Sequence, residues 1–174
     1  MNALVNEAAR LRPHRDGDPV LRATKTAAVI LARRVQALDA ELVLLDTQLE
    51  PLVKATAPAL LNVYGCGFDT AAILLTAAGD NAGRIRSEAA WAKLCGVAPI
   101  PATTGKITER VRLNPGGNRQ ANHALWRIVI TRMSSDPRTR TYVQRRLDEG
   151  LTKPEIFRCL KRYVAREVYQ ALPR

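Results

Sequence analysis

A seam of apolar residues spaced alternately four and three positions apart constrains the N-terminal third of this sequence most strongly. It comprises Leu31, Val35, Leu38, Leu42, Leu45, Leu49 and Leu52. Apolar residues with this repeat lie along one side of an α-helix and match the a and d positions of a coiled coil. The sequence therefore predicts one long helix over residues 20–55, broken or kinked at Pro51. The seam either packs on the chain's own domain or joins two copies, and we favour a homo-oligomer formed through residues 31–52.

A Gly-x-Gly turn separates two apolar helices after this seam. Gly65 and Gly67 form the turn, and Asp69 or Thr70 is expected to cap the second helix. This pattern is typical of a helix-hairpin-helix, in which backbone N–H groups at a helix start bind a phosphate. Two glycines between apolar helices also occur in a plain connection, so both interpretations stay open.

Capping residues, glycines and prolines predict further helices up to the C-terminus. Ser87, Asn118, Asp136 and Thr152 each stand before a helical pattern. The predicted fold class is mainly α, with a long coiled-coil-like helix, a helical domain containing a helix-hairpin-helix-like turn, and at most a short β-hairpin. The predicted domains are an N-terminal segment and linker, the long helix, and a helical DNA-binding domain: residues 1–19, 20–55 and 56–174.

Positive charge is concentrated in the C-terminal part of the chain. Residues 1–100 carry 11 basic and 10 acidic side chains, whereas residues 101–174 carry 16 basic and 6 acidic ones, so the second part contributes +10 of the net +11. Most of these cations are arginines, which bind phosphate in a bidentate way. The excess indicates a nucleic-acid-binding surface, with a solvated basic surface as the alternative. In the last predicted helix, Arg158, Arg162 and Arg166 form a basic line beside an apolar one.

Several kinds of site find no support in the sequence. No apolar run approaches the roughly 18–20 residues that span a bilayer, and the start lacks the pattern of a signal peptide, so a cytoplasmic location is expected. Three cysteines and two histidines at wide spacings form neither a disulfide framework nor a zinc site. The acidic residues of the basic part are scattered, so no metal site is expected. Gly105-Lys106 lacks the first glycine and the following hydroxyl of a phosphate-binding P-loop.

The Thr-Thr-Gly-Lys segment at residues 103–106 is the candidate for nucleophilic chemistry. Attack on a phosphodiester requires an exposed hydroxyl with cations around the phosphate. Thr103 and Thr104 supply hydroxyl groups, and the cations that follow them are Lys106, Arg110, Arg112 and Arg119. On composition alone, a structural turn is the better interpretation of this segment.

Residues 20–172 resemble the C-terminal transposase domain of the IS110 insertion-sequence family. The likeness is carried by the order of the glycine turn, "CGVAP", the Gly-Lys loop, "GGNRQAN" and "RCLKRYVARE". The resemblance implies a DNA recombinase that moves an element with a structured guide RNA. It also implies an N-terminal RuvC-like domain whose acidic residues hold magnesium, a long helical linker that helps to assemble the oligomer, and a C-terminal helical domain with a catalytic serine.

Two departures change what the resemblance implies for this chain. The chain begins about where the family's linker helices begin, so we expect the RuvC-like domain to be missing and no cofactor to be held here, magnesium being expected only with that domain. The serine position, directly before the glycine, is Thr104, preceded by Thr103. The extra methyl group of threonine crowds an in-line attack on phosphorus.

The leading hypothesis is a truncated insertion-sequence transposase fragment that binds DNA in transposition and recombination and is inactive alone. By resemblance, a structured guide RNA is a further partner, a nucleoid-associated location follows, and whether this chain is an enzyme stays open. The alternatives are a non-catalytic nucleic-acid-binding protein on the same domain and a coiled-coil assembly module. Thr104 and Thr103 are the catalytic candidates, and the DNA-binding candidates are Gly65, Gly67, Lys106, Arg110, Arg112, Arg119, Arg158, Arg162 and Arg166.

Overall fold

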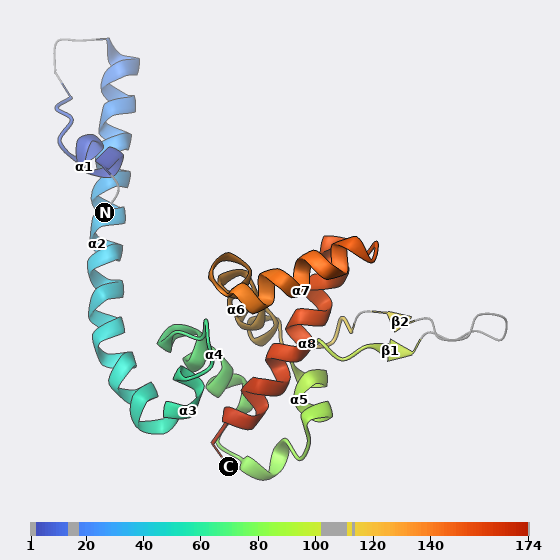
Figure 1. Ribbon diagram of the computed structural model, residues 1–174. Coiled ribbons are helices and arrows are strands. Elements are labelled where there is room, and N and C mark those ends of the chain that lie inside the picture. The colour runs from blue at the N-terminus through green and yellow to red at the C-terminus, as the bar shows by residue number, and fades with distance from the viewer. Residues whose placement is uncertain (1–2, 14–17, 102–110, 113, 174) are drawn as a thin grey trace. The chain divides into compact units, whose positions relative to one another are not determined.

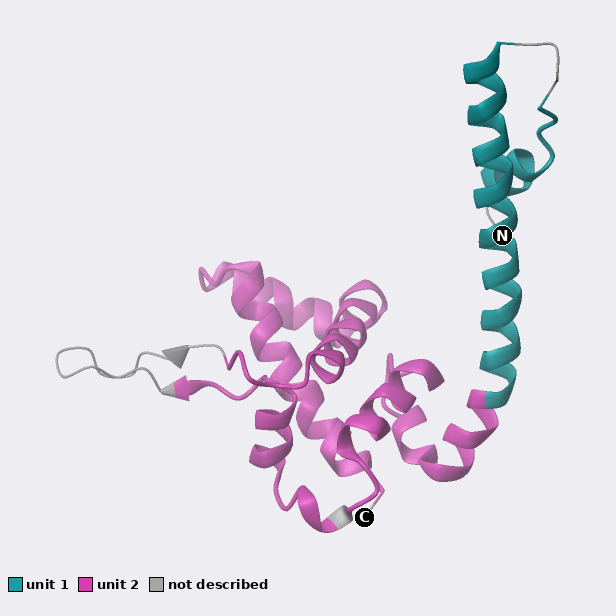
Figure 2. Cartoon of the chain, turned by 180° about the vertical axis from the view of Figure 1, so that it is seen from behind, with its two compact units in different colours: residues 1–48 teal, residues 49–174 magenta. Residues whose placement is uncertain are grey.

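The structure, a computed structural model, describes residues 3–13, 18–101, 111–112 and 114–173. It is mainly α-helical, which confirms the predicted fold class. Contacts divide the chain into two compact units, residues 1–48 and 49–174 (Figure 2). The bounds of the three segments predicted from the sequence are set by helix-breaking residues, whereas the bounds of these two units are set by contacts. The two units therefore do not test the predicted bounds.

The first unit contains α1 (Ala3–Ala9) and most of α2 (Pro19–Thr56), which lie side by side (Figure 1). The amide of Gln36 donates a 3.0 Å hydrogen bond to the side-chain oxygen of Asn6. Val29 and Ala32 of α2 are buried. The long helix predicted from the sequence is therefore confirmed.

Helix α2 continues through Pro51 to Thr56, so the proline does not break the helix, and of the two expectations only a kink at Pro51 stays a prediction. Proline removes one backbone hydrogen bond from a helix. Two residues further on, Val53 is buried in the core of the second unit, and its carbonyl accepts a 2.9 Å hydrogen bond from the N–H of Ala57. This burial favours helical backbone on both sides of the proline.

The apolar seam of α2 is exposed over most of its length. Leu49 packs, partly buried, against the core of the second unit. The other six seam residues are each at least 40% exposed: Leu31, Val35, Leu38, Leu42, Leu45 and Leu52. A long row of exposed leucines is unusual for a helix that packs only within its own chain.

The second unit is a helical domain around one core. Its helices are α3 (Pro58–Leu61), α4 (Phe68–Ala78), α5 (Glu88–Leu94), α6 (Arg119–Ser135), α7 (Pro137–Asp148) and α8 (Lys153–Ala171), with a 3-10 turn at Ala82–Arg84. Helix α6 packs against α4, α7 and α8, and α8 also packs against α5 (Figure 1). Large side chains that are fully buried in this core include Leu60, Leu74, Trp91, Leu125, Ile128 and Ile156.

The helix caps mostly follow the sequence. The hydroxyl of Ser87 accepts the N–H of Ala90 at 3.2 Å, and Asn118 accepts the N–H of Ala121 at 2.9 Å. Asp136 likewise caps α7, and Thr152 forms a capping box in α8. The expected cap of α4 is wrong, because Gly67 takes the N-cap position and Asp69 and Thr70 lie inside the first turn.

Two short strands interrupt the helices between α5 and α6. Ile100–Pro101 (β1) pairs antiparallel with Val111–Arg112 (β2), with Ile100 opposite Arg112. The strands leave the helical domain side by side (Figure 1). They flank residues 102–110, which lie outside the described residues. None of the helices in the described part of the chain is both long enough and apolar enough to cross a membrane.

Candidate nucleic-acid interface

Two glycines that are distant in sequence meet at the base of the strand pair. Gly96 follows α5 with a positive φ of 67°, which glycine adopts without strain. Gly117 lies so close that a Cβ atom built on it would be 2.3 Å from the Cα atom of Gly96. The N–H of Asn118 then donates a 2.6 Å hydrogen bond to the carbonyl of Leu94. The "GGN" segment before α6 is thereby packed onto the C-terminal end of α5.

Two asparagines satisfy carbonyl groups at the same helix end. The side-chain amide of Asn114 donates to the carbonyl of Lys93 at 3.1 Å, and that of Asn122 donates to the carbonyl of Cys95 at 2.8 Å. Carbonyls in the last turn of a helix lack the N–H partner four residues on, and that of Lys93 also accepts the N–H of Gly96 at 3.1 Å. These bonds fix the segment that follows β2 against α5 and α6.

A first hollow, the aromatic hollow, opens on one side of this junction. It has a volume of about 600 Å³. Its aromatic side chains, His123 and Trp126, are stacked with ring centroids 5.4 Å apart and planes 21° apart. The remaining lining residues are Gly96, Asn114, Pro115, Gly117, Arg119, Asn122 and Lys161.

A second hollow, the arginine hollow, is about 670 Å³ in volume and lies against α8. Four of its cations come from that helix: Arg158, Lys161, Arg162 and Arg166. Pro99, directly before β1, also lines it, whereas Asn114, shortly after β2, lines the aromatic hollow. The two hollows therefore flank the residues at which the strand pair begins and ends.

Lys161 belongs to the walls of both hollows, as does Gly96. Burial, and then the charge of Arg158, lower the pKa of the Lys161 ammonium group below its ordinary value. An ammonium group that has lost part of its hydration gains from a phosphate partner, because the anion favours the charged form. Lys161 is thus placed to contact a polyanion that crosses from one hollow to the other.

Two of the predicted DNA-binding arginines already have an anionic partner. The carboxylate of Glu88 on α5 pairs with Arg162 at 2.5 Å and with Arg166 at 3.0 Å. Burial acts to raise the pKa of Glu88, but hydrogen bonds and charge from these arginines outweigh it and lower the pKa. Arg158 is exposed, and its position in the arginine hollow makes it the better placed cation for a phosphate.

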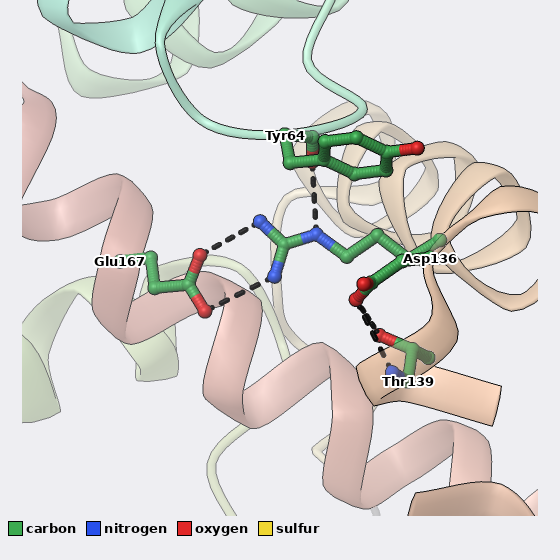
Figure 3. Close-up of polar contacts among 5 residues, drawn as sticks. Tyr64, Asp136, Thr139 and Glu167 are labelled. Carbon is green, nitrogen blue, oxygen red and sulfur yellow. Dashed lines mark hydrogen bonds and ion pairs between the residues drawn. The ribbon is translucent and has the colours of Figure 1, made fainter. Parts of the chain in front are cut away.

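The glycine turn between α3 and α4 is tied to the core by an arginine. In Figure 3 a guanidinium group lies between Glu167 and Tyr64; it belongs to Arg132. Its Nε donates to the carbonyl of Tyr64 at 2.8 Å, and its two terminal nitrogens donate to the Glu167 carboxylate at 3.0 and 2.7 Å. Nearby, the Asp136 carboxylate accepts a 2.6 Å hydrogen bond from the Thr139 hydroxyl.

The two glycines of this turn, Gly65 and Gly67, have different surroundings. Gly65 has a φ of 83°, and a Cβ atom there would be 3.2 Å from the carbonyl oxygen of Ile128, so the residue packs against α6. Gly67 faces open space at the start of α4. Asp69 in that first turn pairs with Arg127, which leaves a carboxylate close to the N–H groups that a phosphate would use. A helix-hairpin-helix contact with DNA stays a prediction.

The structure places only part of the predicted site. Arg119 lines the aromatic hollow, and Arg158, Arg162 and Arg166 line the arginine hollow. The sequence interpretation missed Lys161, His123 and Trp126, although the spacing of Arg119, His123 and Trp126 puts all three on one face of a helix. The residues that lie outside the described part of the chain are Thr103, Thr104, Lys106, Arg110 and the side chain of Arg112.

The family resemblance implies magnesium only together with the RuvC-like domain, so no magnesium site is expected in this chain. Over residues 3–13, 18–101, 111–112 and 114–173, no three or more His, Cys, Asp or Glu side chains converge so that they could hold a metal ion. The carboxylates near the hollows are engaged instead, Glu88 with two arginines and Glu155 in the capping box of α8.

Sequence comparison identifies the family. The Transposase IS116/IS110/IS902 family matches residues 57–144, which include the glycine junction and all of α6. This chain belongs to that family. The resemblance seen in the sequence motifs is therefore confirmed, and the family match spans half of the chain.

Two relatives show how much of a longer protein this chain matches. It is 33% identical, over 62% of its length, to an uncharacterized 43.6 kDa protein of insertion element IS110 from Streptomyces coelicolor. It is 28% identical, over 72% of its length, to an uncharacterized 42 kDa protein of insertion element IS900 from Mycobacterium paratuberculosis. The matches cover 27% and 32% of these relatives, so the chain spans about a third or less of their length.

Proposed function

We propose that this chain is a nucleic-acid-binding part of an insertion-sequence transposase and that it binds DNA during transposition and recombination. One observation carries the proposal: the two hollows that share Lys161 and Gly96 lie beside the strand pair and are lined by arginines of α6 and α8. Membership of a transposase family supports a DNA substrate. By family resemblance a structured guide RNA is a second polyanion for the same surface, and such partners would place the chain on the nucleoid.

We expect phosphate binding to begin with cations that form no ion pair in the described part of the chain. Arg158 still acts on one nearby carboxyl, because hydrogen bonds from Thr152, and then the charge of Arg158, lower the pKa of Glu155. Arg119 and Arg158 are exposed and line different hollows, and no ion pair is seen between either of them and another described residue. Arg162 and Arg166 would have to exchange Glu88 for phosphate, which lowers their net gain. The affinity of the chain for DNA should therefore depend most on Arg119 and Arg158.

The test compares charge reversals inside and outside the hollows. The double variant Arg119→Glu with Arg158→Glu should weaken binding of a fluorescent DNA duplex at least tenfold at moderate salt. The double variant Arg138→Glu with Arg140→Glu is the matched control, because both arginines are exposed on α7 and line neither hollow. Equal affinities for the double variant and the control would contradict the proposal, and so would a wild-type chain that binds no DNA.

We further propose that this chain does not exchange DNA strands by itself. Thr104 stands at the position of the family's catalytic serine, and its methyl group hinders an in-line attack. Incubation with DNA should give no covalent adduct that survives denaturation. An adduct that disappears in Thr104→Ala would overturn this part of the proposal and make the threonine a nucleophile.

The seam of α2 supports self-association through residues 31–52. Its exposed leucines repeat every 3.5 residues, which suits a second copy of the same helix. Leu42→Asp combined with Leu45→Asp should convert an oligomer into a monomer in analytical ultracentrifugation. Val43→Asp combined with Leu44→Asp is the matched control, because Val43 (63% exposed) and Leu44 (59% exposed) lie off the seam. A wild-type chain that is already monomeric at micromolar concentration would rule out this interface.

An assembly module without a nucleic-acid role remains the alternative. It predicts that the chain self-associates through α2 while neither DNA nor RNA binds at low salt. The two measurements above therefore separate the alternatives: binding that responds to Arg119 and Arg158 supports the transposase role, and self-association alone supports the module.

A further inference from the structure

The two tryptophans of this chain lie in opposite environments. Trp91 is fully buried in the core, whereas Trp126 is 41% exposed on α6. Tryptophan carries the largest apolar side chain, so leaving it in water forgoes a large gain in burial free energy. His123, stacked on Trp126, is exposed as well. Two exposed and stacked aromatic rings at the edge of a hollow suggest a site that receives a flat ligand.

The charge around these rings indicates what that ligand carries. Arg119 lies one helical turn before His123 on the same face of α6, and Lys161 reaches the hollow from α8. None of the residues that line the aromatic hollow in the described part of the chain is acidic. A molecule with a flat apolar face and adjoining negative charges fits this combination, and a nucleotide has both.

We propose that His123 and Trp126 form a stacking platform for an unpaired nucleobase, with Arg119 and Lys161 binding the flanking phosphates. This inference rests on the proposed nucleic-acid function and adds a preference for single strands. Bases inside a duplex are covered by their neighbours on both faces, so only an unpaired or extruded base offers a face to the platform. The occupant is therefore a single-stranded segment of DNA or RNA.

The platform should tolerate any base. The amide of Asn122 is engaged on both sides, because it donates to the carbonyl of Cys95 and accepts from Lys161 at 2.9 Å. The amide of Asn114 is also engaged, by the carbonyl of Lys93 and the N–H of Gly116. Because internal hydrogen bonds already hold both amides, we expect recognition to depend mainly on stacking against the π face that every base has.

Tryptophan fluorescence can detect the platform directly. Acrylamide should quench the emission of Trp126 strongly and that of buried Trp91 weakly, and Trp126→Phe should leave only the shielded emission. A short single-stranded oligonucleotide should protect Trp126 from acrylamide. A strand of equal length and charge in which every base is removed should not. Equal protection by the abasic strand would overturn the stacking proposal, because contact with phosphates alone would then explain it.

Affinity measurements provide the second test. Trp126→Ala should weaken single-strand binding by about 5- to 100-fold, and by a clearly larger factor than it weakens duplex binding, whereas Trp126→Phe should retain most of the affinity. Thermal unfolding of each variant checks that a loss of affinity does not come from a loss of the fold. Parallel titrations with DNA and RNA strands identify which of the two binds more tightly.

Two failures can be told apart in the same titrations. If the wild type binds neither strand nor duplex at low salt, both the nucleic-acid function and the platform are overturned. If the wild type binds both and Trp126→Ala binds the single strand equally well, only the platform is overturned.

Discussion

Lys161 donates a 2.9 Å hydrogen bond to the side-chain oxygen of Asn122 and so joins α8 to α6 in the wall shared by the aromatic and arginine hollows. The same asparagine donates to the carbonyl of Cys95 at the end of α5. One amide thus connects three helices at the point where the two hollows meet. The position of the Lys161 charge is set by this network and not by a freely rotating side chain.

The pH dependence of DNA binding should reveal this lysine. Burial, followed by the charge of Arg158, lowers the pKa of Lys161 from its ordinary value of 10.5, and only the protonated form attracts phosphate. Duplex affinity should therefore fall as the pH rises towards 10.5, with the loss beginning below that value. Lys161→Arg keeps its charge over this range and should show a flatter profile. Identical profiles at constant salt would exclude Lys161 from the interface.

The Gly96–Gly117 contact should make the second glycine difficult to replace. Gly117→Ala should destabilise the chain by about 1–3 kcal/mol, because the new Cβ atom would lie 2.3 Å from the Cα of Gly96. Gly116→Ala is the adjacent control, since a Cβ atom there would meet the Asn114 side chain at 3.5 Å, an ordinary contact. Urea unfolding measures both changes, and equal midpoints would mean that the glycine junction is not tightly packed.

Local features of the fold could be predicted from the sequence, because each rests on a few consecutive residues. Ser87 and Asn118 cap helices as expected, and the 3.5-residue repeat gives the long helix. The cap of α4 could not be predicted in this way, because α4 begins at Phe68 and Gly67 takes the N-cap position before Asp69 and Thr70. The continuation of α2 through Pro51 also could not be predicted locally, because it is favoured by the burial of Val53 in the core.

The candidate site depends on contacts between residues that are distant in the sequence, and no local sequence pattern identifies such contacts. The sequence shows a line of Arg158, Arg162 and Arg166 but not that Glu88, on another helix, pairs with two of them. It shows two glycine motifs but not that Gly96 and Gly117 touch. Such contacts follow from how α5, α6 and α8 pack, which is a property of the whole core. The role of Thr104 stays a prediction, because that residue lies outside the described part of the chain.

The Arg132–Glu167 pair should contribute more to stability than a surface pair. The Arg132 side chain is 11% exposed and also holds the Tyr64 carbonyl, so Arg132→Met should cost about 1–3 kcal/mol of unfolding free energy. Lys54→Met is the control, because Lys54 is 62% exposed in its pair with Glu50 and should cost about 0.5 kcal/mol or less. Chemical denaturation compares them. Equal losses of unfolding free energy would show that the Arg132–Glu167 pair stabilises the fold no more than a surface ion pair does.

The three cysteines should differ in reactivity. Burial raises the pKa of Cys66 to about 11, with a smaller opposing effect from Arg132, and raises the pKa of Cys95 to about 12. Both thiols are therefore protonated and shielded near neutral pH, whereas Cys159 is half-buried at the arginine hollow. A chromogenic disulfide reagent should modify one thiol quickly in the native chain, and Cys159→Ser should remove that phase. Rapid reaction of all three would mean that the core opens readily.

The salt dependence of DNA binding tests the central claim, that the two hollows form one phosphate-binding surface, most directly. The logarithm of the association constant should fall linearly with the logarithm of salt concentration. The Arg119→Glu, Arg158→Glu double variant should reduce the magnitude of that slope by about two relative to the wild type and to the Arg138→Glu, Arg140→Glu control. A wild-type slope near zero, or one that the double variant leaves unchanged, would contradict the claim.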